Sequence, residues 1–251
     1  MAHELRRTKT PDFPLRLHVY LAKCGVCSRR QGEQLIAQGR VSVNGTVIRT
    51  QGTMVEADDI VEYEGRRLFP TRKMVYLAVH KPPRMLSTSK DPEGRPIVMD
   101  LLKTEFSMRM FTVGRLDFLS SGLILVTNDG DFALAAMHPS AAIDKEYLVE
   151  TKRPVTTDML DQFKRGIMVE GVRYAIDSYS LKTPFRMTLV LHEGKNREIR
   201  RVFQHWKATV KRIHRVRIGP VRIKGIASGT FRHLTDDEIQ WFLRQTTGAA
   251  R

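Results

Sequence analysis

The sequence predicts an α+β fold in which a small N-terminal α/β module precedes a larger domain built on a mainly antiparallel sheet. Two segments near the N-terminus have apolar residues at helical spacing and lead into a short hairpin pattern. Six later runs are strand-like, whereas four later segments have helical spacing. Because these strands outnumber the helices and few of them alternate with helices, the antiparallel arrangement is favoured.

The first folded unit is expected over residues 15–65. Its first helix ends near Gly25, a residue suited to the left-handed conformation that often follows a helix. Ser28 and Gln31 have the spacing of a capping box, in which two side chains satisfy free amide groups at a helix N-terminus. A second helix is therefore expected to begin after Ser28 and to end near Gly39.

A β-hairpin is expected after the second helix, because Asn44-Gly45 lies between the short runs 41–43 and 46–48. Asn-Gly favours such a turn since both of its residues tolerate positive φ. A further strand is expected at residues 59–63. A unit of about 50 residues buries only a marginal core by itself, so it is interpreted as an accessory module.

Two charged segments flank this module. Residues 1–14 have no apolar core and are interpreted as a mobile basic tail rather than a signal peptide. Residues 64–73 are charged, contain Pro70 and are interpreted as a linker. The ordered parts of the chain are therefore expected in the module and in the second domain.

The second domain is expected over residues 74–245, a length that supports one substantial core. Its strand-like runs are 74–80, 123–127, 146–150, 175–181, 187–192 and 210–216. Its helix-like runs are 131–137, 158–164, 197–206 and 236–243. The last of these begins with a second capping-box pattern, formed by Thr235 and Glu238.

Positive charge is concentrated in two regions. The chain has 42 Lys and Arg against 27 Asp and Glu, which gives a formal charge of +15 and a pI of about 10.2. Residues 1–50 contribute nine basic and three acidic side chains, and residues 195–224 contribute eleven and one. This predicts a polyanionic partner, most often nucleic acid. The alternative is a generally basic solvated surface, which the apolar residues interleaved with the second cluster disfavour.

Several protein classes are disfavoured by the motifs the sequence lacks. Its two cysteines, Cys24 and Cys27, exclude a disulfide framework and favour a cytoplasmic location. Their spacing is that of half a zinc site, but packing at a helix–helix corner is the favoured interpretation because no second pair is present. Phosphate-binding loops, the G-x-S-x-G elbow and membrane-length apolar runs are absent. We therefore expect no metal, no nucleotide or other cofactor, and no membrane partner.

A carboxylate occupies an unusual position at Asp117, between apolar segments and bracketed by Gly114 and Gly122. A carboxylate in such surroundings must be solvated or paired with a cation. One interpretation is a reactive group. The alternative is a structural Asp bound to Arg115 or to backbone amides.

A basic helix could supply the cation. Asn196 can cap the helix expected at 197–206, and Ile199 lies on the apolar face of that helix. Arg200 lies beside this face, so its head group is expected to be partly buried and to need a carboxylate, for which Asp117 is the candidate. The alternative is that the arginines of this helix simply bind phosphate: Arg197, Arg200 and Arg201.

Five short blocks make the sequence recognisable. In chain order they are Lys81-Pro82 with Ser87-Thr88, Gly114-Arg115-Leu116-Asp117 with its Gly-Leu-x-Leu-x-Thr-Asn-Asp-Gly continuation, His138-Pro139-Ser140, Lys145-Glu146-Tyr147-Leu148-Val149, and Gly194-Lys195-Asn196-Arg197-Glu198-Ile199-Arg200-Arg201. On these blocks, residues 15–243 resemble the RsuA/RluB-type pseudouridine synthases, which isomerise uridines in ribosomal RNA. The first unit resembles the alpha-L RNA-binding module of a small-subunit ribosomal protein, on residues 21–30 and 40–45.

The resemblance implies roles for individual residues. Asp117 matches the essential aspartate of the family, Tyr147 matches the tyrosine that packs on the target base, and Arg200 matches the basic partner of the aspartate. Ile199 matches the apolar residue that lines the pocket. RNA contacts are expected from a further set of mostly basic residues: Arg115, Lys195, Arg197, Arg201, Arg29, Arg30, Arg40 and Asn44.

The sequence departs from the family pattern at two positions. The family commonly has Gly where Arg84 stands, and often Thr where Ser120 stands. Ser120 keeps the hydroxyl group. Arg84 is expected to change the loop and its contacts with the target, but not the chemistry.

The implied reaction breaks the bond between uracil N1 and the ribose and then joins C5 to the same sugar carbon. It needs an ionised carboxylate, which a neighbouring Arg stabilises. Tyr147 can stack on the base, and the target must leave its own stack first. Three roles stay open for Asp117: attack on the ribose, attack on the base, and removal of a ribose proton.

The expected partner is small- or large-subunit ribosomal RNA, or a ribosomal assembly intermediate, and the enzyme is expected to be a monomer. The alternative from another class is a non-catalytic ribosome-binding or assembly factor. The presence of Asp117, Tyr147 and Arg200 disfavours it. A DNA- or membrane-binding basic protein is the third alternative, which the five blocks disfavour.

Overall fold

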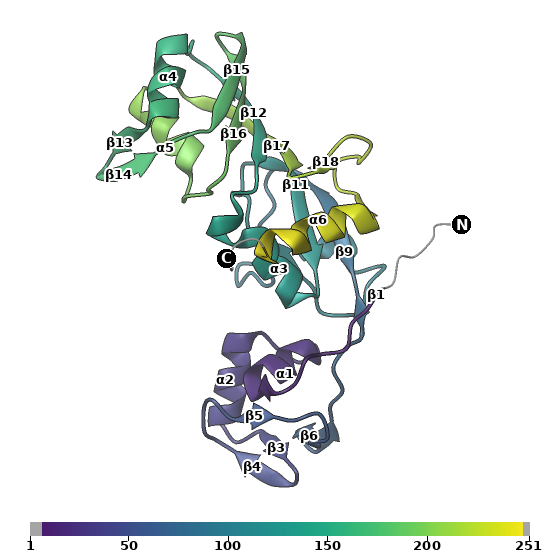
Figure 1. Ribbon diagram of the computed structural model, residues 1–251. Helices are drawn as coiled ribbons and strands as arrows, with labels where there is room; N and C mark the ends of the chain where they lie inside the picture. Colours follow the sequence, from purple (N-terminus) through teal and green to yellow (C-terminus); the bar gives the residue numbers. More distant parts are fainter. Residues whose placement is uncertain (1–6, 248–251) are drawn as a thin grey trace. The chain divides into compact units, whose positions relative to one another are not determined.

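The computed structural model describes residues 7–247 and divides into two compact units. The first unit extends to Val75 and includes Phe106–Arg109, and the second comprises Tyr76–Glu105 and the chain from Met110 onward. No helix within the described residues is long and apolar enough to cross a membrane. The elements of both units are labelled in Figure 1.

Two helices form one side of the first unit, α1 (Leu17–Lys23) and α2 (Arg29–Ala37). The predicted capping box is confirmed, because Gln31 N donates to Ser28 Oγ at 3.2 Å and Ser28 N donates to Gln31 Oε1 at 3.0 Å. The helices pack on a small core: Leu17, Tyr20, Leu21, Cys27, Ile36, Val41, Val55 and Val61.

The predicted hairpin is also confirmed in the first unit. It consists of β3 (Val41–Val43) and β4 (Thr46–Ile48), and its turn has φ of 51° at Asn44 and 78° at Gly45. Strand β6 (Val61–Tyr63) pairs with the other edge of β3. A separate two-stranded ladder joins β2 (Leu15–Arg16) and β5 (Met54–Val55).

The linker predicted at 64–73 is wrong at its beginning. Glu64 and Gly65 have φ of 50° and 74° and form a second tight turn, after which β7 (Arg66–Arg67) pairs with β6. Both residues of β7 are exposed arginines, so the strand has no apolar alternation that a sequence pattern could reveal.

The mobile tail predicted at residues 1–14 is wrong where the structure describes it. Strand β1 (Arg7–Thr8) pairs antiparallel with β8 (Lys73–Met74), and Lys9 N donates to Arg72 O at 3.0 Å. Backbone pairing of this kind needs no particular side chains, so a charged segment can form it. Residues 1–6 of the predicted tail lie outside the described residues.

The second unit is built on a nine-stranded sheet, in which the main strand order is β15-β16-β12-β17-β11-β9-β19. Strand β10 pairs with β11, and β18 pairs with β17. Every pairing of this sheet is antiparallel except that of β11 with β17, which confirms the predicted fold class. The strands are β9 (Tyr76–Lys81), β10 (Phe111–Val113), β11 (Ser121–Thr127), β12 (Lys145–Thr151), β15 (Ser178–Thr183), β16 (Arg186–Leu191), β17 (Val210–Ile218), β18 (Val221–Arg222) and β19 (Phe231–His233).

Helices of the second unit pack in two groups (Figure 1). Helices α3 (Gly130–Met137) and α6 (Asp236–Thr247) contact each other, and the ring centroids of Phe132 and Phe242 lie 5.4 Å apart. Helices α4 (Thr157–Arg165) and α5 (Glu198–His205) contact the small hairpin of β13 (Ile167–Val169) and β14 (Val172–Tyr174). Short 3₁₀ turns lie at η1 (Val98–Leu102) and η2 (Pro139–Ala141).

This arrangement of strands positions the candidate site residues. Asp117 lies just before β11, Tyr147 lies on β12, and β17 separates these two strands. Arg200 lies on α5, which precedes β17 in the chain and contacts it. Residues distant in the sequence therefore converge at one region of the sheet.

Candidate active site

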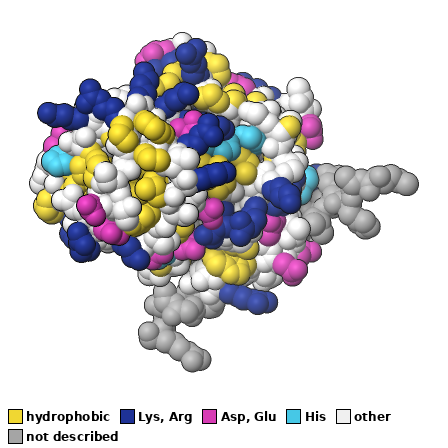
Figure 2. Space-filling model, turned by 90° about the horizontal axis from the view of Figure 1, so that it is seen from above, with side chains coloured by type: hydrophobic (Ala, Val, Ile, Leu, Met, Phe, Trp, Pro, Cys, Tyr) yellow, Lys and Arg dark blue, Asp and Glu magenta, His cyan; other side chains and the backbone are white. Residues whose placement is uncertain are grey.

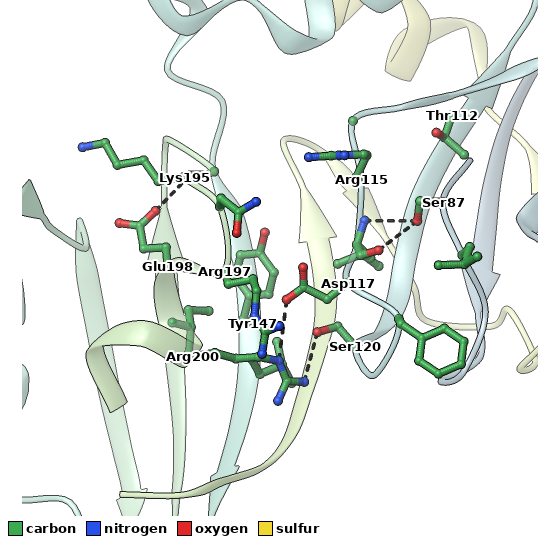
Figure 3. A pocket seen from close by; sticks show the side chains of 18 of the residues that line it. Ser87, Thr112, Arg115, Asp117, Ser120, Tyr147, Lys195, Arg197, Glu198 and Arg200 are labelled. Carbon is green, nitrogen blue, oxygen red and sulfur yellow. Dashed lines mark hydrogen bonds and ion pairs between the residues drawn. The ribbon is translucent and has the colours of Figure 1, made fainter. Parts of the chain in front are cut away.

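One cavity of about 850 Å³ lies in the second unit, within the size range of ligand sites. It brings together seven of the residues that the sequence singled out: Arg115, Asp117, Tyr147, Lys195, Arg197, Ile199 and Arg200. All of them except Ile199 are labelled in Figure 3, where their side chains surround the same space. The predicted residue Arg201 does not line this cavity.

The loop that carries Asp117 is held in place by Ser87. Ser87 Oγ donates to Leu116 O and accepts from Leu116 N, both at 3.1 Å. On the other side of Asp117, a turn closes through Ser120 N, which donates to Asp117 O at 3.0 Å. The Asp117 side chain is 39% exposed, so a fixed backbone presents an accessible carboxylate to the cavity.

Arg200 provides the cation beside Asp117. Arg200 Nε lies 3.6 Å from Asp117 Oδ2, and Arg200 Nη2 donates to Ser120 Oγ at 3.3 Å (Figure 3). The Arg200 side chain is 14% exposed. Burial lowers the pKa of Arg200, although the Asp117 carboxylate opposes the shift. The ion pair expected from the sequence is therefore present, with a single contact to the carboxylate.

The N-terminus of α5 is organised differently from the expectation. Asn196 is not the N-cap; Arg197 occupies that position with φ of 51° and no side-chain cap bond. Glu198 instead fixes the loop before α5, because its carboxylate accepts a hydrogen bond from Lys195 N at 3.2 Å. Burial raises the pKa of this carboxyl group. Arg197 is exposed and lines the cavity.

Two of the predicted RNA-contact residues near α5 already have partners. Lys195 Nζ lies 2.9 Å from Glu193 Oε2 and donates to Arg173 O at 2.9 Å. Arg201 Nη1 lies 3.2 Å from Glu170 Oε2, and both of these side chains are more than one-third exposed. Exposed pairs of this kind are weak and can exchange for phosphate contacts.

Tyr147 forms part of the cavity wall and is 8% exposed. Its hydroxyl accepts a 3.4 Å hydrogen bond from Arg215 Nη1, and the Arg215 guanidinium carbon lies 5.9 Å from the Tyr147 ring centroid. Arg215 Nε also donates to Leu123 O at 2.7 Å. Among the described residues, buried Arg215 Nη2 has no hydrogen-bond partner.

Arg215 was not identified by the sequence analysis, because it lies within the basic run at 195–224 and resembles a solvated cation there. The sequence does contain one sign of close packing around Arg215, namely the glycine at position 122. A Cβ atom at Gly122 would lie 2.2 Å from Arg215 O, so the backbones of β11 and β17 approach closely at this point. On the other side of β17, Arg215 is the cross-strand partner of Tyr147, which places its guanidinium beside the tyrosine ring.

Lys81 is a second buried cation that the sequence analysis did not place in the site. It is fully buried, and its Nζ donates to Met85 O at 2.8 Å and to Pro82 O at 3.0 Å. Burial lowers its pKa to about 8, although the Asp117 carboxylate opposes the shift. The available signal was a Lys at the end of an otherwise apolar strand.

The loop after Lys81 has a left-handed backbone at Arg84. Arg84 has φ of 60°, in the left-handed region that favours Gly. Its amide donates to Phe118 O at 2.6 Å, so this loop is fixed to the turn that carries Asp117. The Arg84 side chain itself is exposed.

The predicted residues of the first unit differ in their availability. Arg29 and Arg30 are exposed on α2. Arg40 forms an ion pair with Glu64, and its guanidinium carbon lies 5.2 Å from the Tyr63 ring centroid. Asn44 uses both side-chain polar atoms within the unit, for Asp59 Oδ1 at 2.8 Å and for the amide of Ile60 at 2.9 Å.

The two cysteines are free thiols, and Cys27 is buried in the core of the first unit, as the packing interpretation predicts. Across residues 7–247, no group of three or more His, Cys, Asp or Glu could hold a metal ion. Figure 2 shows a face on which Lys and Arg side chains are more abundant than Asp and Glu, with apolar side chains among them. Such a face suits a polyanion.

Comparisons with known proteins agree on one family. The family model for RNA pseudouridylate synthases matches residues 75–205, and that for the S4 domain matches residues 15–61. The chain is 35% identical over 231 residues to the ribosomal large subunit pseudouridine synthase B of Bacillus subtilis, covering 90% of this chain and 94% of that protein. It is 36% identical to the dual-specificity RNA pseudouridine synthase RluF of Escherichia coli, covering 91% and 78%.

Two further similarities extend this result. The chain is 39% identical over 218 residues to an uncharacterized RNA pseudouridine synthase of Borreliella burgdorferi, covering 85% of this chain and 87% of that protein. A crystal structure of a pseudouridylate synthase matches with a TM-score of 0.67 and 24% identity, covering 91% of this chain and 99% of the other. The structural match supports the fold.

Proposed function

This chain belongs to the RNA pseudouridylate synthase family and is an RNA pseudouridine synthase, and we propose that its target is a uridine in small- or large-subunit ribosomal RNA. The names of the Bacillus subtilis and Escherichia coli relatives support this substrate class. The +15 formal charge of the chain is consistent with a large polyanionic substrate.

The observation that carries the assignment is the accessible Asp117 carboxylate beside Tyr147 and Arg200 in one cavity. Isomerisation breaks the N1–C1′ bond of the uridine and forms a C5–C1′ bond. The C5 proton leaves, and N1 gains a proton, so no oxidant or reductant is consumed. Asp117 is proposed as the group that initiates this exchange, and Arg200 keeps the carboxylate ionised and oriented.

The other cavity residues have proposed roles that follow from their chemistry. Tyr147 stacks on the detached base, and Ile199 closes the pocket around it. The basic residues around the cavity bind the neighbouring phosphates: Arg115, Lys195, Arg197 and Arg201. Containment of the base matters because a free uracil ring that diffuses away cannot be rejoined through C5.

The first unit is proposed to hold the RNA at a second place. Exposed Arg29 and Arg30 on α2 are the strongest candidates for phosphate contacts, and Arg40 and Asn44 stay predictions because their side chains bind within the unit. We further propose that the enzyme acts as a monomer, without metal or nucleotide cofactor, on ribosomal RNA or an assembly intermediate in the cytoplasm. Each uridine isomerisation needs only one such cavity.

Pseudouridine mapping tests this proposal. Ribosomal RNA from cells lacking the protein should lose one or a few pseudouridines, and wild-type protein should restore them where Asp117→Asn does not. The purified protein should also release tritium from [5-³H]uridine in a transcript containing the mapped site, because C5 loses its hydrogen. An unchanged pseudouridine map together with no tritium release from small- and large-subunit transcripts would contradict the proposed substrate.

A further inference from the structure

Two arginines of the second unit have a backbone conformation that their place in the fold does not explain. Seven described residues other than Gly have φ between 41° and 60°, in the left-handed region that favours Gly. Five of them occupy a tight hairpin turn or the end of a helical segment, where this conformation is usual: Asn44, Glu64, Ala142, Glu170 and Lys207. The other two are Arg84 and Arg197, with φ of 60° and 51°.

Neither arginine lies where local structure requires the left-handed region. Arg84 lies in an irregular loop after β9. Arg197 is the N-cap residue of α5, a position at which the backbone is usually extended. Strained residues of this kind cluster at functional sites, where the placement of a side chain compensates for the strain. The two positions therefore need an explanation from function.

Both arginines lie at the cavity that contains Asp117. Arg197 lines this cavity, and Figure 3 shows it close to Asp117. Arg84 N donates to Phe118 O at 2.6 Å, and Phe118 also lines the cavity. Arg197 lies three residues before Arg200, which pairs with Asp117. Two separate loops thus bring the two arginines to the turn that carries the candidate catalytic carboxylate.

The positive charges of these two side chains are uncompensated. Both side chains are exposed, and within residues 7–247 neither guanidinium has a hydrogen bond or an ion pair. By contrast, Lys195 and Arg201 in the same region each pair with a glutamate. Burial and the nearby charge of Arg197 both lower the pKa of Arg200, so positive charge accumulates here. An anion bound at this edge of the cavity would offset that charge.

We propose that Arg84 and Arg197 form a phosphate clamp, which binds the two RNA phosphates flanking the target uridine while its base occupies the cavity. This inference rests on the proposed function. A nucleotide whose base and ribose reach Asp117 leaves its 5′ and 3′ phosphates at the mouth of the cavity, beside the loops that carry the two arginines. Guanidinium groups bind phosphate through two parallel hydrogen bonds, and a fixed backbone reduces the entropy lost on binding.

The clamp is tested first by the RNA affinity of full-length variants, measured at several salt concentrations on a single-stranded ribosomal RNA fragment containing the mapped uridine. Arg84→Ala and Arg197→Ala each remove one guanidinium. We expect each to weaken binding about three- to tenfold, and to reduce the slope of log affinity against log salt by about 0.7, the value for one phosphate contact. Each variant therefore reports on one half of the clamp.

Lys207→Ala is the matched control. Lys207 is also basic, exposed and left-handed, with φ of 56°, but it follows α5 and does not line the cavity. The control removes the same charge from the same kind of backbone. Its affinity should stay within about twofold of wild type, with an unchanged salt slope.

Neutral linkages identify the phosphates that are bound. The fragment is made with 2′-deoxy sugars at the target and the preceding nucleotide, and either the 5′ or the 3′ linkage of the target is replaced by an uncharged methylphosphonate. Wild type should bind both of these RNAs more weakly than the deoxy control with ordinary phosphates. Arg84→Ala should bind one of them as well as wild type does, because the phosphate that it no longer contacts is already neutral. Arg197→Ala should do so for the other.

Two variants separate the Arg84 side chain from the backbone of its loop. Arg84→Gly permits the left-handed backbone without strain and should melt within about 2 °C of wild type, but it should bind RNA as weakly as Arg84→Ala. Arg84→Lys keeps the charge and should keep the salt slope. It should still lose part of the affinity, because Lys cannot form the bidentate contact.

Three results would overturn the clamp. The first is an equal salt slope for Arg84→Ala and Lys207→Ala. The second is an equal loss by Arg84→Ala on the charged RNA and on both neutral-linkage RNAs. The third is normal affinity of Arg84→Ala together with weak binding by Arg84→Gly. The proposed function is tested separately, by wild-type tritium release from the unmodified fragment, so its failure is distinguishable from failure of the clamp.

Discussion

In the second unit, Arg200 and Arg217 are both partly buried and both pair with carboxylates, but they differ in the number of contacts that they make. Arg217 donates to Glu146 Oε2 at 2.8 Å, to Asp144 Oδ2 at 3.3 Å and to Gly219 O at 3.1 Å. Arg200 has one 3.6 Å ion pair with Asp117 and one hydrogen bond to Ser120. Their side chains are 16% and 14% exposed, so burial does not explain the difference.

The pKa values of the two arginines shift in opposite directions. Burial opposes the charge of Arg217, but hydrogen bonds to Glu146 and Asp144 prevail and raise its pKa. Burial lowers the pKa of Arg200 despite Asp117. The carboxylates of Asp117 and Asp144 are equally accessible, at 39% and 40% exposed, so the two pairs differ in the contacts of their arginines. An arginine with several hydrogen bonds stabilises the fold, whereas one with fewer contacts is more available to a substrate. The contrast supports the proposed role of Asp117 and Arg200 in the reaction.

The largest effect is expected on the reaction rate, where loss of the Asp117 carboxylate should matter far more than loss of the Asp144 carboxylate. Asp117→Asn keeps the shape of the side chain and removes its charge, and we expect the single-turnover rate to fall at least about a hundredfold with RNA affinity nearly unchanged. Asp144→Asn is the matched control and should leave the rate within about threefold of wild type. Normal turnover by Asp117→Asn would remove this residue from the chemistry.

The next largest effect is expected on the free energy of unfolding, where the Arg217 pair should matter more than the Arg200 pair. Arg217→Ala should lower the free energy of unfolding by about 1–3 kcal/mol, because it removes the 2.8 Å hydrogen bond to Glu146 and leaves Asp144 with only its 2.7 Å contact to His192. Arg200→Ala should cost less than Arg217→Ala, since its single weak ion pair is lost beside a solvent-accessible carboxylate. Urea unfolding of the two variants measures both values. A larger loss for Arg200→Ala would show that this pair is structural.

The smallest expected effect extends the contrast to the first unit, where Arg40 is paired and Arg29 and Arg30 are exposed. The double variant R29A/R30A should bind RNA several-fold more weakly. It should also reduce the slope of log affinity against log salt by about 0.7 for each lost phosphate contact. Arg40→Ala should change the slope less. An unchanged slope for R29A/R30A would indicate that α2 does not bind phosphate.

Much of the fold was predictable because local signals agreed with the final structure. The capping boxes at Ser28 and Thr235 and the Asn44-Gly45 turn each specify a backbone conformation through a few neighbouring residues. The β1–β8 ladder was missed because it pairs segments that are distant in the sequence, and strand β7 was missed because both of its residues are exposed arginines. Strands made of charged residues show no alternation of apolar and polar side chains, so a search for that alternation does not find them.

The candidate site was predictable in its residues but not in its supporting contacts. The resemblance and the apolar face of α5 indicated Asp117 and Arg200. Asn196 was expected to cap α5, but the N-cap residue is Arg197, which has a left-handed backbone. The loop before the helix is held by the hydrogen bond from Lys195 N to the Glu198 carboxylate. Arg215 and Lys81 were missed since burial of a cation depends on the packing of several strands, which a single segment does not reveal.

The role of the Asp117–Arg200 pair is tested most directly by the single-turnover rates of Arg200→Ala and Arg201→Ala at saturating RNA. Both changes remove one positive charge from adjacent positions of α5, but Arg200 faces Asp117 and Arg201 faces Glu170. We predict that Arg200→Ala is about tenfold or more slower than wild type, whereas Arg201→Ala keeps its rate and mainly weakens binding. Arg200→Lys should retain part of the rate, because a charge survives in a different geometry. Equal rates for Arg200→Ala and wild type would contradict the proposed role of the Asp117–Arg200 pair in the reaction.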